Sequence, residues 1–202
     1  ALVRWRLEDG TYLPPSSFVD IFEKNRFCSK LDFYMLKKAI LQIRKWIDMG
    51  MEPVNISVNQ SKIVFYHENY ISELKSLLEE YNVSGSYITL EVLESTVIED
   101  IDMFNSILTE VKKLGFSVSL DDFGSGYSSL NVLSKLQIDE LKIDRIFLHT
   151  KSEVDNQRTK WILESIIEIA KKSQILVVVE GVESKQDDLF IKSLGADVGQ
   201  GY

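Results

Sequence analysis

Cysteine and histidine are scarce in this chain, which has one cysteine and two histidines among 202 residues. Cys28 alone cannot form an internal disulfide or supply a zinc cluster, so a reducing compartment is compatible with the sequence. We interpret Cys28 as a packing residue of a helix. The two histidines, His67 and His149, lie away from the predicted strand ends, and we interpret both as surface or packing residues.

Long apolar runs and an excess of positive charge are also missing. The longest strongly apolar run, "ILVVV" at 175 to 179, is too short to cross a bilayer, and the N-terminus lacks the pattern of a signal peptide. We therefore expect a cytoplasmic chain without membrane contact. The formal net charge of -8 argues against nucleic acid polymers as partners, because they bind to basic surfaces.

Short apolar strands alternate with longer amphipathic segments along the chain. The predicted strands cover 54 to 58, 87 to 92, 116 to 121, 138 to 143 and 175 to 180, with a weaker one at 196 to 200. Two helical stripes are predicted, one of Leu36, Ile40, Ile43 and Ile47 and one of Ile162, Ile166, Ile169 and Ala170. Helices are expected to end at Gly50, Gly115 and Gly195. This alternation indicates an α/β fold, a parallel sheet covered by helices, as an open doubly wound sheet or a closed barrel.

Polar residues mark the carboxyl ends of the predicted strands. They are Asn59, Glu91, Asp121, Asp122, Lys142, Glu180 and Gln200. In a parallel barrel such side chains converge on one rim, whereas an open sheet gathers its ligands at one switch point. Polar residues at the ends of all six strands favour the barrel.

Four of these residues are carboxylates that would repel one another without a partner. Hard divalent cations relieve that repulsion, and a ligand set made only of oxygen points to Mg²⁺ or Mn²⁺ rather than zinc. Adjacent Asp121 and Asp122 can bridge two such ions if the turn at Gly124 and Gly126 brings Asp122 round to the side of Asp121. Two bridged ions suit the hydrolysis of a phosphate ester.

Several motifs, taken in order, resemble the EAL domain family of cyclic di-GMP phosphodiesterases. They are "ALVRW" at 1 to 5, "SVNQS" at 57 to 61, "LEVLES" at 90 to 95, "DDFGSGYSSL" at 121 to 130, "LKIDRIF" at 141 to 147, "VEGVES" at 179 to 184 and "GQGY" at 199 to 202. The resemblance runs from end to end of the chain. It implies a modified (β/α)8 barrel with one antiparallel strand, and hydrolysis of cyclic di-GMP to linear pGpG with two Mg²⁺ or Mn²⁺ ions.

The resemblance also implies roles for individual residues. The implied metal ligands are Asn59, Glu91, Asp121, Asp122 and Glu180. Glu180 is also the implied general base, and Lys142 lies near the attacking water. Arg4, Gln200 and Asp144 are implied to contact the substrate, with Asp144 on the same strand face as Lys142. Glu94 is implied to anchor the loop after the paired aspartates, and Glu183 to support the site.

Three departures from the family pattern bear on activity. The signature glutamate, itself a family metal ligand, should immediately precede Ala1, so we expect residues 1–202 to be a single EAL-type domain truncated at both ends. Its first strand and part of its second would lie upstream. Leu93 replaces a common threonine between the two glutamates of "LEVLES", and Val179 replaces a common alanine and adds bulk beside Glu180.

Other functions stay open at this point. A catalytically weak EAL domain can act as a cyclic di-GMP receptor or as a protein-interaction module, and an unrelated metal-dependent barrel can act on another phosphate ester. The resemblance further implies a homodimer, and fusion to sensor or diguanylate cyclase domains. The enzyme is favoured because the chain retains Asn59, Glu91, Asp121, Asp122, Lys142 and Glu180.

Overall fold

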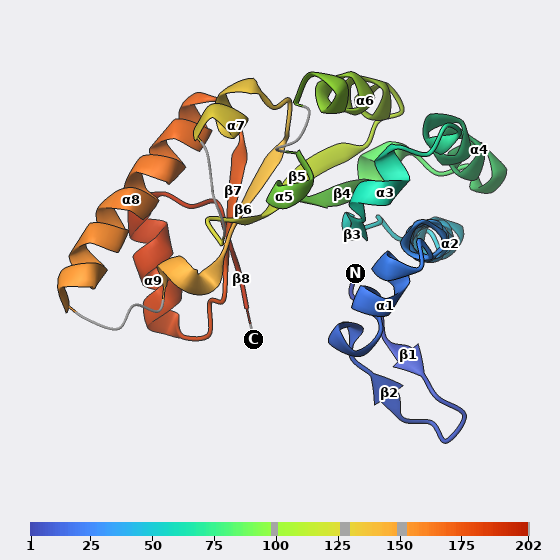
Figure 1. Ribbon diagram of the computed structural model, residues 1–202, viewed down its shortest axis with the longest axis horizontal. Helices are drawn as coiled ribbons and strands as arrows, with labels where there is room; N and C mark the ends of the chain where they lie inside the picture. The colour runs from blue at the N-terminus through green and yellow to red at the C-terminus, as the bar shows by residue number, and fades with distance from the viewer. Residues whose placement is uncertain (98–100, 126–129, 149–152, 202) are drawn as a thin grey trace. The chain divides into compact units, whose positions relative to one another are not determined.

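Strands and helices alternate in a computed structural model of the chain, which describes residues 1–97, 101–125, 130–148 and 153–201 (Figure 1). The strands are β1 (Trp5–Arg6), β2 (Tyr12–Leu13), β3 (Ile56–Gln60), β4 (Ile88–Leu93), β5 (Ser117–Phe123), β6 (Glu140–Ile143), β7 (Leu176–Glu180) and β8 (Val198–Gln200). The α-helices are α1 (Val19–Lys24), α2 (Cys28–Asp48), α3 (Lys62–Phe65), α4 (Tyr70–Tyr81), α5 (Glu94–Val97), α6 (Ile101–Lys113), α7 (Leu130–Lys135), α8 (Glu153–Lys172) and α9 (Lys185–Leu194). Three 3-10 turns are η1 (Pro15–Ser17), η2 (Gly85–Tyr87) and η3 (Arg145–Phe147).

The predicted strands form a sheet with the order β3-β4-β5-β6-β7-β8. The strands pair in parallel from β3 to β4 and from β5 through β8, which confirms the α/β class. The antiparallel pair in the described residues is a separate hairpin of β1 and β2 rather than a member of these strand pairs. Three strands, β3, β4 and β5, end further along the chain than predicted, so that Asn59 and Asp122 fall inside β3 and β5.

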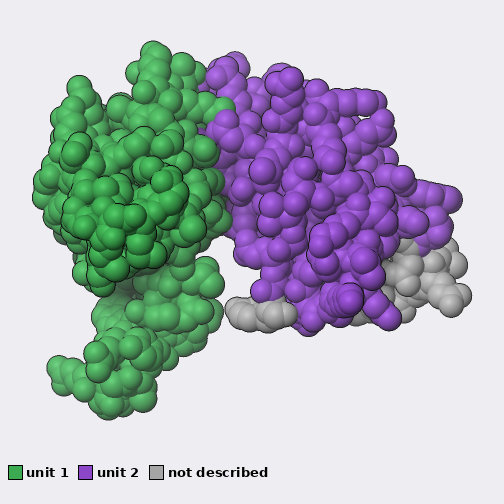
Figure 2. All heavy atoms as spheres, turned by 180° about the vertical axis from the view of Figure 1, so that it is seen from behind, with its two compact units in different colours: residues 1–92, 106–117 green, residues 93–105, 118–202 purple. Residues whose placement is uncertain are grey.

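The chain divides into two compact units, coloured separately in Figure 2. Unit 1 contains residues 1–92 and 106–117, and unit 2 contains residues 93–105 and 118–202. The single domain expected from the resemblance stays a prediction. None of the described helices is long and apolar enough to cross a membrane.

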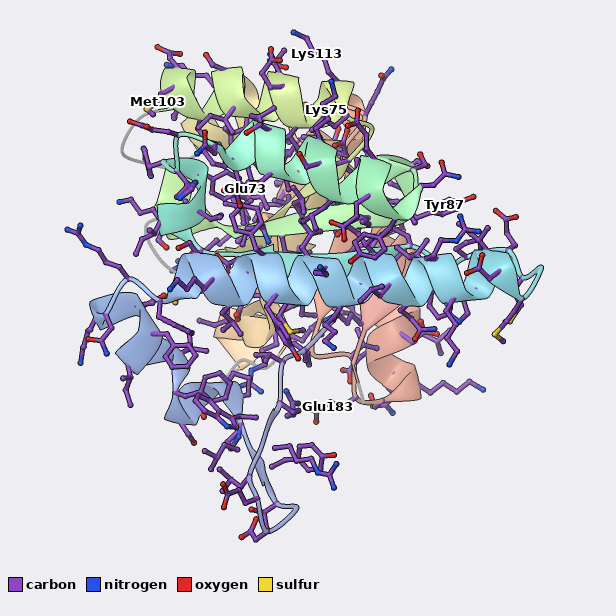
Figure 3. The ribbon with its side chains drawn as sticks, turned by 90° about the vertical axis from the view of Figure 1, so that its right-hand side faces the viewer. Glu73, Lys75, Tyr87, Met103, Lys113 and Glu183 are labelled. Atoms are coloured by element: carbon purple, nitrogen blue, oxygen red, sulfur yellow. The ribbon has the colours of Figure 1, made fainter. Side chains whose placement is uncertain are left out.

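Unit 1 is organised around the long helix α2, which packs against β3, α3 and α4. The predicted stripe Leu36, Ile40 and Ile43 is fully buried, whereas Ile47 is only half-buried near the end of the helix. Figure 3 shows α2 beside α4, the helix that carries Glu73 and Lys75. Cys28 is buried at the start of α2, as the sequence predicts.

Surface and helix-end predictions also hold in the described residues. His67 lies on the surface, where its Nδ1 is 3.6 Å from Glu73 Oε1, while His149 lies outside the described residues. Gly50, Gly115 and Gly195 follow helices and all have positive φ. The predicted helix ends are therefore confirmed.

In unit 2, α8 and α9 cover one face of β7 and β8 (Figure 1). The predicted α8 stripe is partly wrong, because Ile162 and Ile169 are 47% and 38% exposed. The buried stripe consists of Leu163, Ile166, Ile167 and Ala170. Their spacing is also that of one helical face, rotated from the predicted one, and packing against the sheet selects it.

A buried carboxylate connects α2 with the end of β3 in unit 1. Asp32 Oδ2 accepts hydrogen bonds from the Ser61 backbone N–H (3.0 Å) and from Ser61 Oγ (2.5 Å). Burial raises the pKa of Asp32 to about 6, although the hydrogen bonds from Ser61 oppose this rise. At the same end of β3, the buried Tyr70 hydroxyl donates a hydrogen bond to Gln60 Oε1 (3.0 Å).

Asp32 should therefore make the stability of the fold depend on pH. Because its folded-state pKa of about 6 exceeds the ordinary value of 3.8, its contribution is complete below about pH 4 and is lost as the pH rises through about 6. Asp32→Asn should remove this loss. The free energy of unfolding of the variant, relative to that of the wild type, should therefore rise by about 3 kcal/mol between pH 4 and pH 7. Urea denaturation across that range measures the difference. Parallel pH profiles for the two proteins would contradict the assignment.

Candidate cation-binding site

Strand β5 contains one extra residue at the paired aspartates. Its partner β6 advances two residues, from Leu141 to Ile143, while β5 advances three, from Leu120 to Phe123. Asp122 takes up the extra residue with a left-handed backbone (φ 57°). This bulge resolves the geometric problem of two adjacent carboxylates, because neighbouring residues of a regular strand point to opposite faces.

The bend therefore lies at Asp122 itself and not only at the glycines after it, as the sequence suggested. Gly124 does have a positive φ of 98°, whereas Gly126 lies outside the described residues. The carbonyl of Asp122 accepts hydrogen bonds from the Ser125 N–H (3.1 Å) and from Ser125 Oγ (2.8 Å). Sequence reasoning missed Ser125, although a serine beside a glycine after a strand is a common turn signal.

A buried lysine on β6 contacts carboxylates on the two neighbouring strands, β5 and β7. Lys142 Nζ, from β6, lies 2.8 Å from Asp121 Oδ1 on β5 and 2.7 Å from Glu180 Oε1 on β7. Only 4% of Lys142 and 8% of Asp121 are exposed, so this ion pair is shielded from water. Gln200, opposite Glu180 in the β7–β8 register, donates from Nε2 to Glu180 Oε1 (3.2 Å). The predicted gathering of polar side chains at the strand ends is thus present in unit 2.

The second face of these strands is apolar. Leu141, Ile143, Val177 and Val179 are fully buried. Gly199, the register partner of Val179, packs against Ile191 of α9, so this face meets the helices. Since side chains alternate along β7, Val179 points away from the face that carries Glu180, contrary to the predicted bulk near the site.

Three carboxylates in unit 2 lie close enough to share a cation. One oxygen from each of Asp121, Asp122 and Glu180 lies within 4.8 Å of the others. Burial raises the pKa of Asp122 above its ordinary value, and the negative charges of Asp121, Glu180 and Asp144 raise it further against the opposing effect of Lys142. The single ammonium therefore leaves negative charge in excess. An all-oxygen set with this excess fits a hard divalent cation such as Mg²⁺ or Mn²⁺.

Three other predicted site residues lie in unit 1. Asn59 and Glu91 are direct register partners on β3 and β4, and Glu91 is buried while Asn59 is exposed. Arg4 is exposed just before β1, and its guanidinium donates to the Val3 carbonyl (2.8 Å). The pairing of Asn59 with Glu91 follows from their equivalent positions at the ends of neighbouring parallel strands.

Asp144 is placed differently from its prediction. It does not continue the strand face of Lys142, because β6 ends at Ile143 and Asp144 caps the turn η3 by accepting from the Ile146 N–H (2.7 Å). Its carboxylate nonetheless lies near enough to raise the pKa of Asp122.

Glu94 and Glu183 contribute to local structure in unit 2. Glu183 is exposed, and its backbone N–H donates to Asp187 Oδ2 (3.3 Å) in the turn that begins α9 (Figure 3). Glu94 is buried at the start of α5, directly after the partly exposed Leu93. The loop that it was predicted to anchor includes residues 126–129, which lie outside the described residues.

Comparisons with known proteins agree on one family. The model of the EAL domain family matches residues 1–202. The chain is 33% identical over 202 residues to the bifunctional diguanylate cyclase/cyclic di-GMP phosphodiesterase MucR of Pseudomonas aeruginosa, and 34% identical to the cyclic di-GMP phosphodiesterase NbdA of the same organism. Both matches cover 100% of this chain, which spans only 29% and 26% of those two proteins.

The fold is likewise similar to a solved structure, that of the PaMucR phosphodiesterase in complex with c-di-GMP. The TM-score is 0.89 at 33% sequence identity, and the match covers 100% of this chain and 81% of that one. This likeness supports the α/β, barrel-related fold class predicted from the sequence.

Removing the buried ammonium should destabilise unit 2. Lys142→Met would leave the buried Asp121 and the half-buried Glu180 without their cation, which typically costs about 3 kcal/mol in unfolding free energy at pH 7. Urea denaturation at pH 7, without divalent cations, measures this loss.

The matched control is Lys172→Met on α8. Lys172 Nζ also lies close to a carboxylate, 2.6 Å from Glu168 Oε1, but both side chains are largely exposed. An exposed pair of this kind is worth about 0.5 kcal/mol or less. Equal effects of the two substitutions would show that Lys142 is not held in a buried charge cluster.

Proposed function

The chain belongs to the EAL domain family, and from this premise we propose that it is a cation-dependent phosphodiesterase that hydrolyses cyclic di-GMP to linear pGpG. The curated relatives named above are cyclic di-GMP phosphodiesterases, one of them bifunctional. The chain spans less than a third of each of them, so activity in the whole protein, its dimerisation and its fusion to sensor or diguanylate cyclase domains are part of the proposal.

The observation that carries the proposal is the charge cluster at the ends of β5, β6 and β7. Asp121, Asp122 and Glu180 bring carboxylate oxygens within 4.8 Å of one another, and Lys142 Nζ contacts two of the three groups. A fold needs no such concentration of partly buried negative charge for its stability, because carboxylates that share a site raise the free energy of their ionised forms. The cluster therefore supports a role in binding cations and a phosphate ester.

When bound, Mg²⁺ or Mn²⁺, proposed as a pair, would supply a water of lowered pKa and neutralise phosphate charge. Asp121, Asp122 and Glu180 would hold the cations, and the bulge at Asp122 orients the second aspartate towards the first. Lys142 holds its ammonium between Asp121 and Glu180, where it can stabilise negative charge that develops on phosphate oxygens. Glu180 is proposed to accept the proton of the attacking water at a carboxylate oxygen.

The remaining residue assignments are proposed from their motifs. Asn59 and Glu91 are proposed as further oxygen ligands, which is consistent with their direct pairing across β3 and β4. Arg4, Gln200 and Asp144 are proposed to contact the substrate. The guanidinium of Arg4 is suited to binding a phosphate. Glu94 is proposed to anchor the loop after the paired aspartates, and Glu183 to support the site from the turn before α9.

Hydrolysis of cyclic di-GMP tests the proposal directly. The protein should convert cyclic di-GMP to pGpG with Mn²⁺ and lose this activity in EDTA. Asp121→Asn should lower turnover at least about 100-fold, because it removes a charged ligand. Chromatography of the nucleotides measures the product, and circular dichroism checks that the variant is folded.

Asp188→Asn serves as the matched control, because it makes the same change on α9, where Asp188 pairs with Lys192 within its own helix. Its turnover should equal that of the wild type. Tight binding of cyclic di-GMP without any linear product would contradict the enzyme and would indicate a receptor instead. A protein that neither binds nor hydrolyses cyclic di-GMP would contradict both functions.

A further inference from the structure

The turn η3 lies beside the two strand ends that carry Asp122 and Glu180. It follows β6 directly, and its capping residue Asp144 donates from its backbone N–H to the carbonyl of Phe123, the last residue of β5 (3.1 Å). Asp144 also accepts from the Ile146 N–H, which closes the turn (2.7 Å). These two hydrogen bonds fix where the side chains of Arg145 and Phe147 can reach.

Phe147 packs directly on the backbone of Gly124, two residues after Asp122. A β-carbon at Gly124 would lie only 2.2 Å from Cε2 of the Phe147 ring, and Gly124 has a φ of 98°. No other residue type fits at this position without moving the ring or the turn. The Phe147 ring therefore packs against the turn that immediately follows the bulge.

Arg145 makes the equivalent contact at the end of β7. A β-carbon at Gly181, the residue after Glu180, would lie 2.3 Å from Cβ of Arg145, and Gly181 has a φ of 74°. The turns that follow Asp122 and Glu180 thus each contain a glycine that packs against η3. Phe147 contacts the turn after Asp122, and Arg145 contacts the turn after Glu180.

We propose that η3 is a spacer that sets the separation of the Asp122 and Glu180 carboxylates, with Phe147 as a positioning residue for the cation site. This inference rests on the proposed function. Asp122 has a left-handed backbone that non-glycine residues rarely adopt, so its position depends on support from its neighbours. Phe147 and Arg145 of η3 pack against the two turns, so the element limits how closely these turns can approach each other.

The spacer predicts that removing the Phe147 ring weakens cation binding more than it weakens the fold. Phe147 is only half-buried, so its truncation leaves the fully buried core of unit 2 in place. Phe147→Ala should raise the Kd for Mn²⁺ about 10-fold, the effect typical of groups that hold metal ligands in position. Phe147→Leu retains part of the bulk and should give a smaller increase. Isothermal titration calorimetry with Mn²⁺ alone measures both values.

Phe104→Leu is the control for a general loss of stability. Phe104 is buried in unit 2 on α6, and none of its atoms is among those nearest to Gly124 or Gly181. It should lower the Tm of the cation-free protein and leave the Kd for Mn²⁺ unchanged. If it weakens Mn²⁺ binding as much as Phe147→Ala does, the effect comes from stability and the spacer is overturned.

A double substitution tests the contact itself. Gly124→Ala forces the turn away from the ring and should weaken Mn²⁺ binding, whereas Gly124→Ala combined with Phe147→Ala should bind no more weakly than Gly124→Ala alone. Fully additive losses would show that the two positions act independently and would overturn the proposal.

The outcomes separate this inference from the proposed function. Wild-type protein that binds Mn²⁺, with an unchanged Kd in Phe147→Ala, overturns the spacer alone. Wild-type protein that binds no Mn²⁺ overturns the cation site and the spacer with it. If Phe147→Ala does not fold, Phe147→Leu decides the question by the same comparison with Phe104→Leu.

Discussion

The ion pairs of Lys142 with Asp121 and Glu180 are the constraint on which the rest of unit 2 depends. A buried ammonium is stable only if carboxylates meet it at hydrogen-bonding distance, and here the partners come from the strands on either side of its own. This requirement constrains the register between β5, β6 and β7. It also decides which face of each strand is polar, because side chains alternate.

The bulge at Asp122 adds a third carboxylate to a cluster in which the Lys142 ammonium already faces two. A regular strand would have sent Asp122 to the apolar face, where Leu141, Ile143 and Val179 are fully buried. The extra residue in β5 turns it back towards Asp121 and Glu180, and the raised pKa of Asp122 records the cost of that placement. Placing a third carboxylate in this cluster costs stability, which is the relation expected when a site is shaped for a ligand.

Sequence patterns predict the sheet and most of unit 2's cluster, but not the local backbone that makes the cluster work. Apolar strands ending in Asp121, Lys142, Glu180 and Gln200 are visible as a pattern, and parallel pairing brings such ends to one edge. The left-handed conformation of Asp122 leaves no comparable signal, because an aspartate at the end of a strand is compatible with both an extended and a left-handed backbone. The contacts of Phe147 and Arg145 with two glycines join segments far apart in sequence, so no local pattern predicts them.

Helix α8 shows a second limit of the same kind. Its sequence offers apolar residues on two overlapping stripes, so helical spacing alone fits both the exposed Ile162 and Ile169 and the buried Leu163 and Ile167. Only packing against the sheet chooses between them. The capping position of Asp144 depends in the same way on where β6 ends, which composition does not determine.

The central claim is that Asp121, Asp122 and Glu180 hold divalent cations, and anomalous scattering from crystals soaked in Mn²⁺ tests it most directly. An anomalous difference map collected near the manganese absorption edge should show its strongest peaks in contact with oxygens of these three carboxylates. Strong peaks elsewhere on a well-ordered protein, with none at the ends of β5 and β7, would contradict the account.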